Sequence, residues 1–224
     1  PLSELRERMN EIPKERTVYV HCRSAQRSYN AVMALLHNGY ENVYTYLGSP
    51  YTGCYTHLSD GVGFANYTAH GSETSWADPS FTVSNVYSLT NADKYFWAMG
   101  NCCNAADWGY SSTCFGEAMI RAEEKAAFSY IGSCPVTYWW EDYYFGVGAT
   151  TITNRMPTFE ETTMGNYDAQ FLEDTYNTIA AVPFVGNLAV AYSHTESGYE
   201  SAATTRYYFE AYHVLGDASI MPYR

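Results

Sequence analysis

Positive charge is scarce in this chain. It has 12 Lys and Arg residues against 24 Asp and Glu residues, which gives a formal net charge of -12. Nucleic-acid phosphates are bound by basic surfaces, so we expect no nucleic-acid partner and a preference for basic ligands. Apolar runs are short as well: none approaches the roughly 20 residues that cross a bilayer, and no signal peptide is recognisable. We therefore expect no membrane span.

The usual patterns of a structural metal site or a disulfide scaffold are also missing. Six cysteines occur in 224 residues, and neither a CxxC nor an HExxH pattern is present. Cys102 and Cys103 are adjacent, which disfavours a bond between them. Structural zinc is not expected. The chain begins at Pro1 rather than Met, which favours a processed product or an excised fragment.

The composition does supply a globular core, since 46% of the residues are hydrophobic and 17% aromatic. The first 48 residues predict a β-loop-α-β unit. Strands are expected at Thr17–His21 and Glu41–Leu47, which are rich in β-branched and aromatic residues. A helix is expected at Ser28–Asn38, ended by Gly39. A short amphipathic helix is expected earlier, at Ser3–Asn10.

Cys22 lies in the loop before this helix, and a helix N-terminus favours the thiolate anion. The loop Val20–Ser28 resembles the active-site loop of rhodanese-like sulfurtransferases, whose cysteine carries a persulfide. The resemblance covers residues 1–48 and implies a sulfurtransferase site at Cys22 with Arg23 and Arg27. The loop has Ala25 where that family usually has glycine, and the family's first half is absent. The alternative is that this piece is structural.

Residues 49–58 form the expected junction between this fragment and a second region, 59–224. The run Gly48–Gly53 is rich in turn residues, and most Asp and Glu residues follow it. Cys54 and His57 are three residues apart but have no further ligands nearby in the sequence. We expect both to lie in a loop.

Two short strands of the second region are expected to end at reactive side chains. Gly63–Thr68 precedes His70, and Lys94–Met99 precedes Cys103; both runs consist mainly of aromatic and small residues. In open parallel sheets, ligands bind beyond the carboxyl ends of the strands. We therefore expect neighbouring strands to bring a cysteine nucleophile and its base to one site.

A third strand, Ala126–Gly132, is expected to lead to the loop Tyr138–Asp142 at the same edge. The other expected elements carry no identified chemistry: a polar loop at 71–79, helices at Val83–Leu89, Thr113–Ala122, Tyr167–Tyr176 and Ala202–Val214, and a strand at Asn187–Tyr192. The alternation of strands and helices predicts the α/β class. We expect the strands at 17–21 and 41–47 to extend the sheet of the second region into one continuous sheet.

Four motifs carry a second resemblance: Phe64–Thr74, Gly100–Cys103, Cys114–Glu117 and Ala211–Asp217. In this order they resemble the catalytic module of the gingipain family of cysteine peptidases, and most closely its lysine-specific members. The resemblance implies a caspase-like fold, a mostly parallel sheet with helices on both faces. It also implies an endopeptidase that cleaves after lysine through a Cys–His dyad and a thioester intermediate.

The resemblance assigns the catalytic roles residue by residue. His70 matches the catalytic histidine, and Cys103 matches the nucleophile because its offset of 11 residues to Cys114 fits the family. The backbone amides of Gly71 and Cys103 would hold the oxyanion. Successive strand residues point in opposite directions, so Cys102 is expected to be buried.

Three further residues would recognise a lysine side chain in the substrate. Asp142 would face the ammonium group, Trp139 would cover the apolar stem, and Thr68 would make a polar contact. The alternative is that Trp139 and Asp142 only pack and cap a loop. The resemblance further implies protein or peptide substrates, no catalytic cofactor, structural calcium whose ligands the spacing does not identify, and a secreted or cell-surface location.

One part of the family's machinery has no counterpart in this sequence. The family orients its histidine with an acid from an upstream strand, and the corresponding position holds Lys14. Glu41 or Asp60 could replace that acid only if the fold brought one of them close. Three functions remain open: the lysine-specific endopeptidase, the sulfurtransferase that uses Cys22, and an inactive chimeric scaffold.

Overall fold

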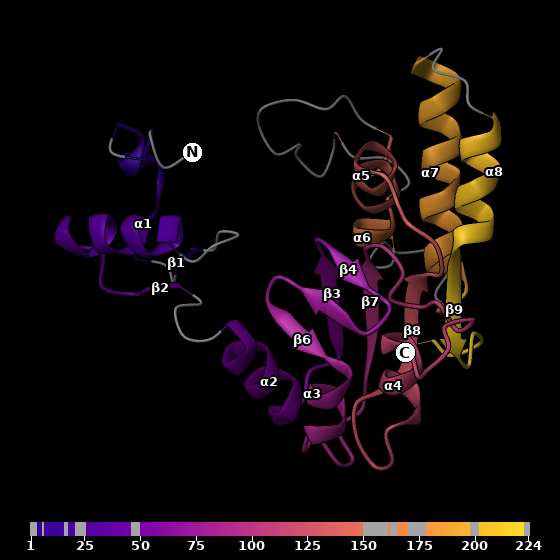
Figure 1. The fold of residues 1–224 in the computed structure, drawn as a ribbon. Helices are drawn as coiled ribbons and strands as arrows, with labels where there is room; N and C mark the ends of the chain where they lie inside the picture. Colours follow the sequence, from indigo (N-terminus) through magenta and orange to yellow (C-terminus); the bar gives the residue numbers. More distant parts are fainter. Residues whose placement is uncertain are drawn as a thin grey trace. The chain divides into compact units, whose positions relative to one another are not determined.

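The computed structural model describes the chain at residues 4–5, 7–15, 18–20, 26–45, 50–149, 161, 165–169, 178–197 and 202–221. The chain divides into two compact units, Pro1–Thr56 and His57–Arg224. We call them the N-terminal and C-terminal units (Figure 1).

The N-terminal unit contains a β-α-β arrangement. Strand β1 (Val18–Val20) pairs in parallel with β2 (Val43–Thr45), and α1 (Gln26–His37) connects the two strands. The buried cluster of this unit combines apolar residues of α1 and β2 with a tyrosine between them: Val32, Leu35, Tyr40 and Val43. The expected order of strand, helix and strand is therefore confirmed.

Two expectations for this unit are wrong. The described residues of Ser3–Asn10, which are 4–5 and 7–10, form no α-helix; a 3-10 turn at Met9–Glu11 follows Arg8, which pairs with Glu4 and Glu11. The continuous sheet is not formed either: β1 and β2 make a two-stranded sheet, and no ladder among the described residues joins it to the sheet of the C-terminal unit. Because α1 leads from β1 back to the start of β2, these two strands pair with each other.

The loop that resembles rhodanese lies largely outside the described residues. Cys22 and Arg23 are not described, and Arg27 is in the first turn of α1 without a described side chain. The sulfurtransferase site therefore stays a prediction.

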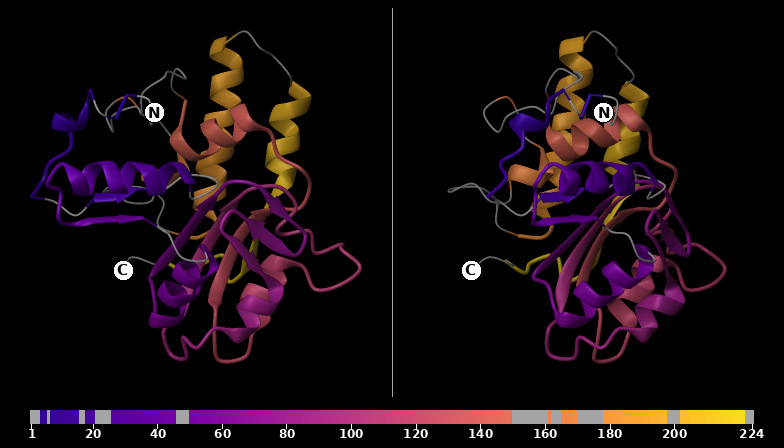
Figure 2. Two further views of the ribbon diagram at one scale, coloured as in Figure 1. Left: turned by 60° about the vertical axis from the view of Figure 1, so that its left-hand side comes forward. Right: turned by 90° about the vertical axis from the view of Figure 1, so that its left-hand side faces the viewer.

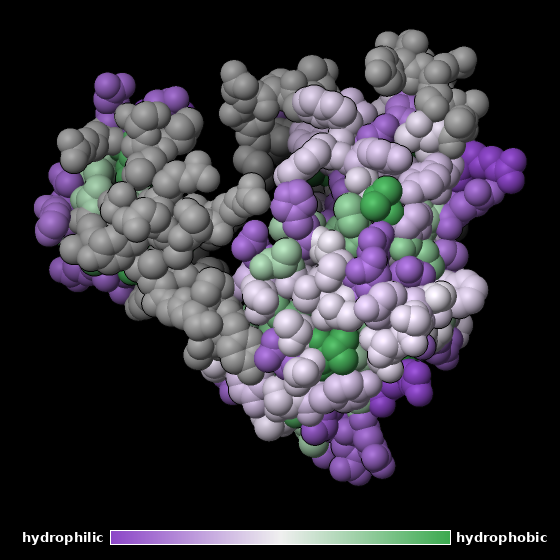
Figure 3. Space-filling view, in the orientation of Figure 1, coloured by the Kyte–Doolittle hydropathy of each residue, from purple (hydrophilic) through white to green (hydrophobic). Residues whose placement is uncertain are grey.

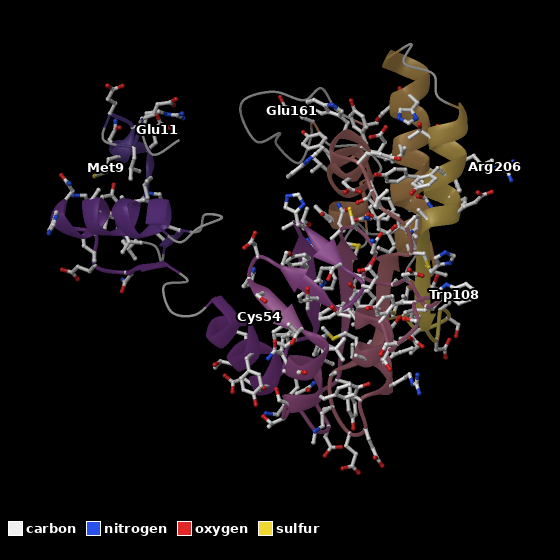
Figure 4. All side chains as sticks on the ribbon, in the orientation of Figure 1. Met9, Glu11, Cys54, Trp108, Glu161 and Arg206 are labelled. Atoms are coloured by element: carbon white, nitrogen blue, oxygen red, sulfur yellow. The ribbon has the colours of Figure 1, made fainter. Side chains whose placement is uncertain are left out.

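The expected junction is helical, because α2 (Pro50–Asp60) runs through it. Proline is favoured in the first turn of a helix, where its missing N–H has no partner to lose. The same Pro50 that suggested a turn therefore begins a helix. Cys54 and His57 lie on α2 and not in a loop (Figure 4).

A four-stranded sheet organises the C-terminal unit. The strand order is β3 (Phe64–Thr68), β7 (Phe96–Asn101), β8 (Ala127–Ser133) and β9 (Tyr212–Gly216). The first three strands are parallel, and β9 runs antiparallel to β8. The prediction of a mostly parallel α/β sheet is confirmed.

Helices cover one face of this sheet, and a buried hydrophobic cluster lies between the helices and the sheet. Trp97 and Ile131 pack there with residues of α5 (Trp139–Val147), α7 (Ala181–Ser197) and α8 (Ala202–Ala211). Helices α7 and α8 lie side by side, and the chain continues from α8 directly into β9 (Figures 1 and 2). The short helix α6 (Asn166–Ala169) contacts both α5 and α7.

The opposite face is covered by α3 (Val83–Ser88), α4 (Phe115–Arg121) and a small antiparallel sheet of β4 (Gly71–Ser72), β5 (Ser75–Ala77) and β6 (Ser80–Thr82). Buried Tyr130 points to this side and accepts a hydrogen bond from Trp76 Nε1 at 3.1 Å. A Cβ atom on Gly100 would lie 2.1 Å from the Tyr130 hydroxyl, so glycine is required beside this ring.

Four expected elements of the C-terminal unit need correction. The polar loop at 71–79 contains β4 and β5, and Tyr138 is the N-cap of α5, so Tyr138–Asp142 begins a helix. The expected strand Asn187–Tyr192 lies inside α7, because a short apolar run does not by itself distinguish a strand from a helix. The expected helix Ala202–Val214 ends at Ala211, where pairing with β8 takes over.

Other helices are confirmed. Val83–Leu89 corresponds to α3, and Thr113–Ala122 to α4. The expected helix at Tyr167–Tyr176 overlaps α6, and residues 170–177 lie outside the described part of the chain. The face of the C-terminal unit in Figure 3 is mostly pale to purple with a few separate hydrophobic residues. Among the described residues, no helix is long and apolar enough to cross a membrane.

Candidate active site

The carboxyl ends of β3 and β7 lie side by side in register. Thr68, the last residue of β3, is paired with Asn101, the last residue of β7. His70 follows Thr68 by two residues, and Cys103 follows Asn101 by two residues. The parallel register therefore places His70 and Cys103 at the same edge of the sheet. Their catalytic roles stay predictions.

The backbone directly after His70 touches the two cysteines. A Cβ atom on Gly71 would lie 2.6 Å from Cys102 Sγ and 2.7 Å from the carbonyl oxygen of Cys103. Only glycine lets the two segments approach this closely. The amides predicted to hold the oxyanion, those of Gly71 and Cys103, thus belong to adjoining segments.

The His70 side chain is exposed and lies against Trp139, with ring centroids 5.6 Å apart and the rings nearly perpendicular. Trp139 stands in the first turn of α5 and is 75% exposed. The carbonyl oxygen of His70 accepts hydrogen bonds from the Tyr67 hydroxyl at 2.6 Å and the Ala77 N–H at 2.9 Å. These bonds hold the backbone of the segment that carries the imidazole.

No orienting acid is identified for His70. Within the residues that the structure describes, no carboxylate is hydrogen-bonded to its imidazole. Lys14, at the position of the family's acid, donates to the Asn38 carbonyl oxygen at 2.8 Å inside the N-terminal unit. Glu41 and Asp60 are both exposed, and Glu41 belongs to the N-terminal unit, so an orienting role for either stays a prediction.

The two cysteines have different environments. Cys102 is 1% exposed, and burial raises its pKa well above the usual value, so it is held as a neutral thiol. The prediction that Cys102 is buried is confirmed. Cys103 is only partly buried, and its Sγ accepts a hydrogen bond from the Thr137 N–H at 3.2 Å. Of the pair, Cys103 is the one available for reaction.

Asp142, in the first turn of α5, is surrounded by hydroxyl groups. Its Oδ2 accepts from Thr137 Oγ1 at 2.6 Å, and its Oδ1 lies 3.0 Å from both the Tyr208 and Tyr212 hydroxyls. Burial raises the pKa of Asp142, and these hydrogen bonds oppose the rise. Burial and the charge of Asp142 also raise the pKa of Tyr208, which therefore remains a neutral donor.

Hydrogen bonds also connect Thr68 to Asp142. The Thr68 hydroxyl bonds the Tyr167 hydroxyl, which accepts from Asn101 Nδ2 at 2.9 Å. The same Asn101 amide donates to the Asp142 carbonyl oxygen at 2.9 Å. Of the three residues predicted to recognise lysine, Thr68 and Asp142 thus share one hydrogen-bond chain, and Trp139 lies against His70.

Sequence reasoning missed the residues that support Asp142. Thr137 carried no motif, and Tyr167 and Tyr208 lie in segments to which only packing was assigned. Tyr212 lies in the motif Ala211–Asp217 but was given no role. Tyr212 donates to Asn101 Oδ1 at 2.6 Å, a contact across 111 positions of the sequence. One sequence feature could have pointed to Asn101: it lies directly before the pair Cys102 and Cys103.

Metal ligands are not grouped in the described part of the chain. No cluster of three or more His, Cys, Asp or Glu side chains there could hold a metal ion. The implied structural calcium therefore stays a prediction, and no step is derived through it.

Comparison with known proteins identifies the family. The model of peptidase family C25 matches residues 6–223, nearly the whole chain. The chain belongs to peptidase family C25. This match includes residues 6–48, and the comparisons give the rhodanese-like interpretation no support.

Individual C25 relatives agree with this assignment. Lys-gingipain of Porphyromonas gingivalis is 58% identical over 187 residues, which are 84% of this chain and 11% of the relative. A solved structure described as a protease superposes with a TM-score of 0.74 at 56% identity, covering 84% of this chain and 42% of that one. The Arg-specific cysteine proteinase gingipain R shares the fold at 19% identity, with a TM-score of 0.62 and coverage of 91% and 46%. The chain thus spans only a part of each relative.

Proposed function

We propose that this C25 chain carries the Cys–His dyad of a cysteine endopeptidase that cleaves peptide bonds after lysine. The observation that supports it most is the register of β3 and β7, which places His70 and Cys103 two residues beyond paired strand ends. The 58% identity to Lys-gingipain supports the choice of lysine.

The reaction follows from the chemistry of the two side chains. The Cys103 sulfur attacks the scissile carbonyl carbon, and the His70 imidazole passes a proton to the leaving amine. The amides of Gly71 and Cys103 stabilise the oxyanion, at about 3 to 4 kcal/mol per donor in comparable sites. Water then hydrolyses the thioester.

Asp142 supplies the negative charge for the substrate ammonium in this proposal. Its burial supports the role, because a carboxylate partly removed from water interacts more strongly with a cation than an exposed one does. Trp139 offers an exposed ring for the apolar stem, and the Thr68 hydroxyl is the polar contact. The proposed substrates are proteins and peptides. The family resemblance also implies that the protein is secreted or lies at the cell surface.

The catalytic proposal is tested by hydrolysis of peptide amides with Lys or Arg at the cleavage position. We expect hydrolysis of the Lys amides, abolished by Cys103→Ala and unchanged by Cys22→Ala. Thiocyanate formation from thiosulfate and cyanide, abolished only by Cys22→Ala, would support a sulfurtransferase instead. Absence of both activities leaves an inactive scaffold and overturns the proposal.

The lysine site is tested separately with Asp142→Asn. Removing one partner of a buried charge pair costs about 2 to 5 kcal/mol, so kcat/KM for the Lys amide should fall about 30-fold or more. The same variant should keep its rate on a norleucine amide. An equal loss on both substrates contradicts a role of Asp142 in charge recognition.

A further inference from the structure

Thr137 contacts both the sulfur of Cys103 and the carboxylate of Asp142. It lies on the segment between β8 and α5. Its N–H donates to Cys103 Sγ at 3.2 Å, and its carbonyl oxygen is 3.7 Å from the same sulfur. Its Oγ1 also lies 3.7 Å from Sγ and donates to Asp142 Oδ2 at 2.6 Å. One residue therefore joins the nucleophile to the acid proposed to bind lysine.

The Thr137 hydroxyl has a single proton, so it donates to only one of these two acceptors at a time. The shorter distance favours donation from the Thr137 hydroxyl to Asp142 Oδ2 when the site holds no substrate. The sulfur at 3.7 Å is within hydrogen-bond range and is the alternative acceptor.

The other carboxylate oxygen is enclosed by two buried tyrosines. The hydroxyl oxygens of Tyr208 and Tyr212 each lie 3.0 Å from Asp142 Oδ1 and leave little room beside it. A substrate ammonium therefore finds Oδ2 the less crowded oxygen. It brings three N–H donors and a full positive charge to the atom that now accepts from Thr137.

We propose that Thr137 couples the two halves of the site: a cation bound at Asp142 displaces the Thr137 hydroxyl, which then donates to Cys103 Sγ and activates the nucleophile. The inference rests on the proposed function, because it takes Asp142 as the cation site. Both the N–H and the O–H of Thr137 then point to the sulfur, which stabilises its anionic form. A lysine side chain thereby increases the reactivity of Cys103 as well as the affinity for substrate.

Alkylation of Cys103 measures this coupling without any peptide hydrolysis. The full chain is treated with iodoacetamide at one fixed neutral pH, with and without n-butylammonium, which has the charge and apolar stem of lysine. Peptide mass spectrometry follows the peptide that contains Cys102 and Cys103, and fragmentation of that peptide counts only the product alkylated on Cys103. 1-Butanol is the uncharged control. The matched variants are Thr137→Val, which has no hydroxyl, and Thr137→Ser, which keeps one.

We expect n-butylammonium to accelerate alkylation about three- to tenfold in the wild type and in Thr137→Ser, as one added hydrogen bond allows. In Thr137→Val the acceleration should be less than about twofold, since only the through-space effect of the cation remains. 1-Butanol should have no effect. If Thr137→Val does not show a cooperative thermal transition, Thr137→Ala takes its place.

Two results overturn the coupling: equal acceleration in the wild type and Thr137→Val, or no acceleration in the wild type. If lysine amides are hydrolysed but the acceleration is absent, the coupling fails while the proposed function stands. If the acceleration is present but no lysine amide is hydrolysed, the proposed function fails and the coupling stands.

Discussion

Asp142 is a half-buried carboxyl group in the first turn of α5. Burial raises its pKa from the usual 3.8, although three hydroxyl groups favour the ionised form. Between the pKa of the unfolded chain and the higher pKa of the folded one, the folded protein binds more protons. The contribution of this group to stability is therefore fully present below the unfolded value and is lost as the pH rises through the folded value.

The raised pKa of Asp142 predicts that the stability difference between the wild type and Asp142→Asn depends on pH. The free energy of unfolding of the wild type, minus that of Asp142→Asn, should fall as the pH rises above about 3.8. Urea unfolding of both proteins between about pH 3 and 6 measures it, and the subtraction removes the titration of all other groups. A difference that grows with pH would show that the hydrogen bonds outweigh the burial.

Gly71 is the residue that allows the histidine segment to meet the cysteines. We expect Gly71→Ala to lower the free energy of unfolding by about 1 to 3 kcal/mol, because its Cβ would overlap Cys102 Sγ. Denaturant unfolding tests this. The matched control is Gly63→Ala, whose Cβ meets no atom within 4 Å. Equal effects in the two variants would contradict the close contact.

At the scale of elements, the position of α5 matters most, since its first turn holds Trp139 and Asp142. Glu141 of the same turn pairs with His194 of α7 at 3.3 Å between Oε1 and Nε2. His194 Nδ1 is 2.8 Å from Thr205 Oγ1 of α8. One buried histidine thus ties the start of α5 to both helices behind it.

We expect His194→Leu to destabilise this helix group, because it leaves the Glu141 carboxylate without its partner in a buried place. The loss should be about 1 to 3 kcal/mol in denaturant unfolding. Arg206→Ala is the control: Arg206 extends outward from α8 (Figure 4) and pairs with exposed Glu210 on the same helix, so little change is expected. Equal losses in the two variants would refute the role of His194.

Helices and strands could be predicted from the sequence where a long residue pattern, or a residue that ends the element, defined their bounds. The strands before His70 and Cys103 and the helices α3 and α4 could be derived from local residues alone. The segment Asn187–Tyr192 could not, because its apolar run suits both a strand and a helix, and packing of α7 on α5 decides between them.

The whole molecule is strongly acidic, with a formal net charge of -12. Its field should attract basic peptides, and salt should screen that attraction beyond about 10 Å at 0.1 M ionic strength. We expect kcat/KM for a lysine peptide with additional basic residues to fall several-fold between about 0.01 and 0.3 M NaCl. The same peptide with neutral flanking residues should change much less. Equal salt dependence would show that the net charge does not guide binding.

The position of His70 and Cys103 at one sheet edge could be derived from the sequence, because local strand signals and the rule for parallel strand ends depend only on neighbouring residues. The burial of Cys102 could be derived as well, from the alternation of strand residues. The surroundings of Asp142 could not, because they depend on the tertiary fold. Its partners Tyr208 and Tyr212 lie 66 and 70 positions away, and only the packing of α8 and β9 against α5 brings their hydroxyls to one carboxylate.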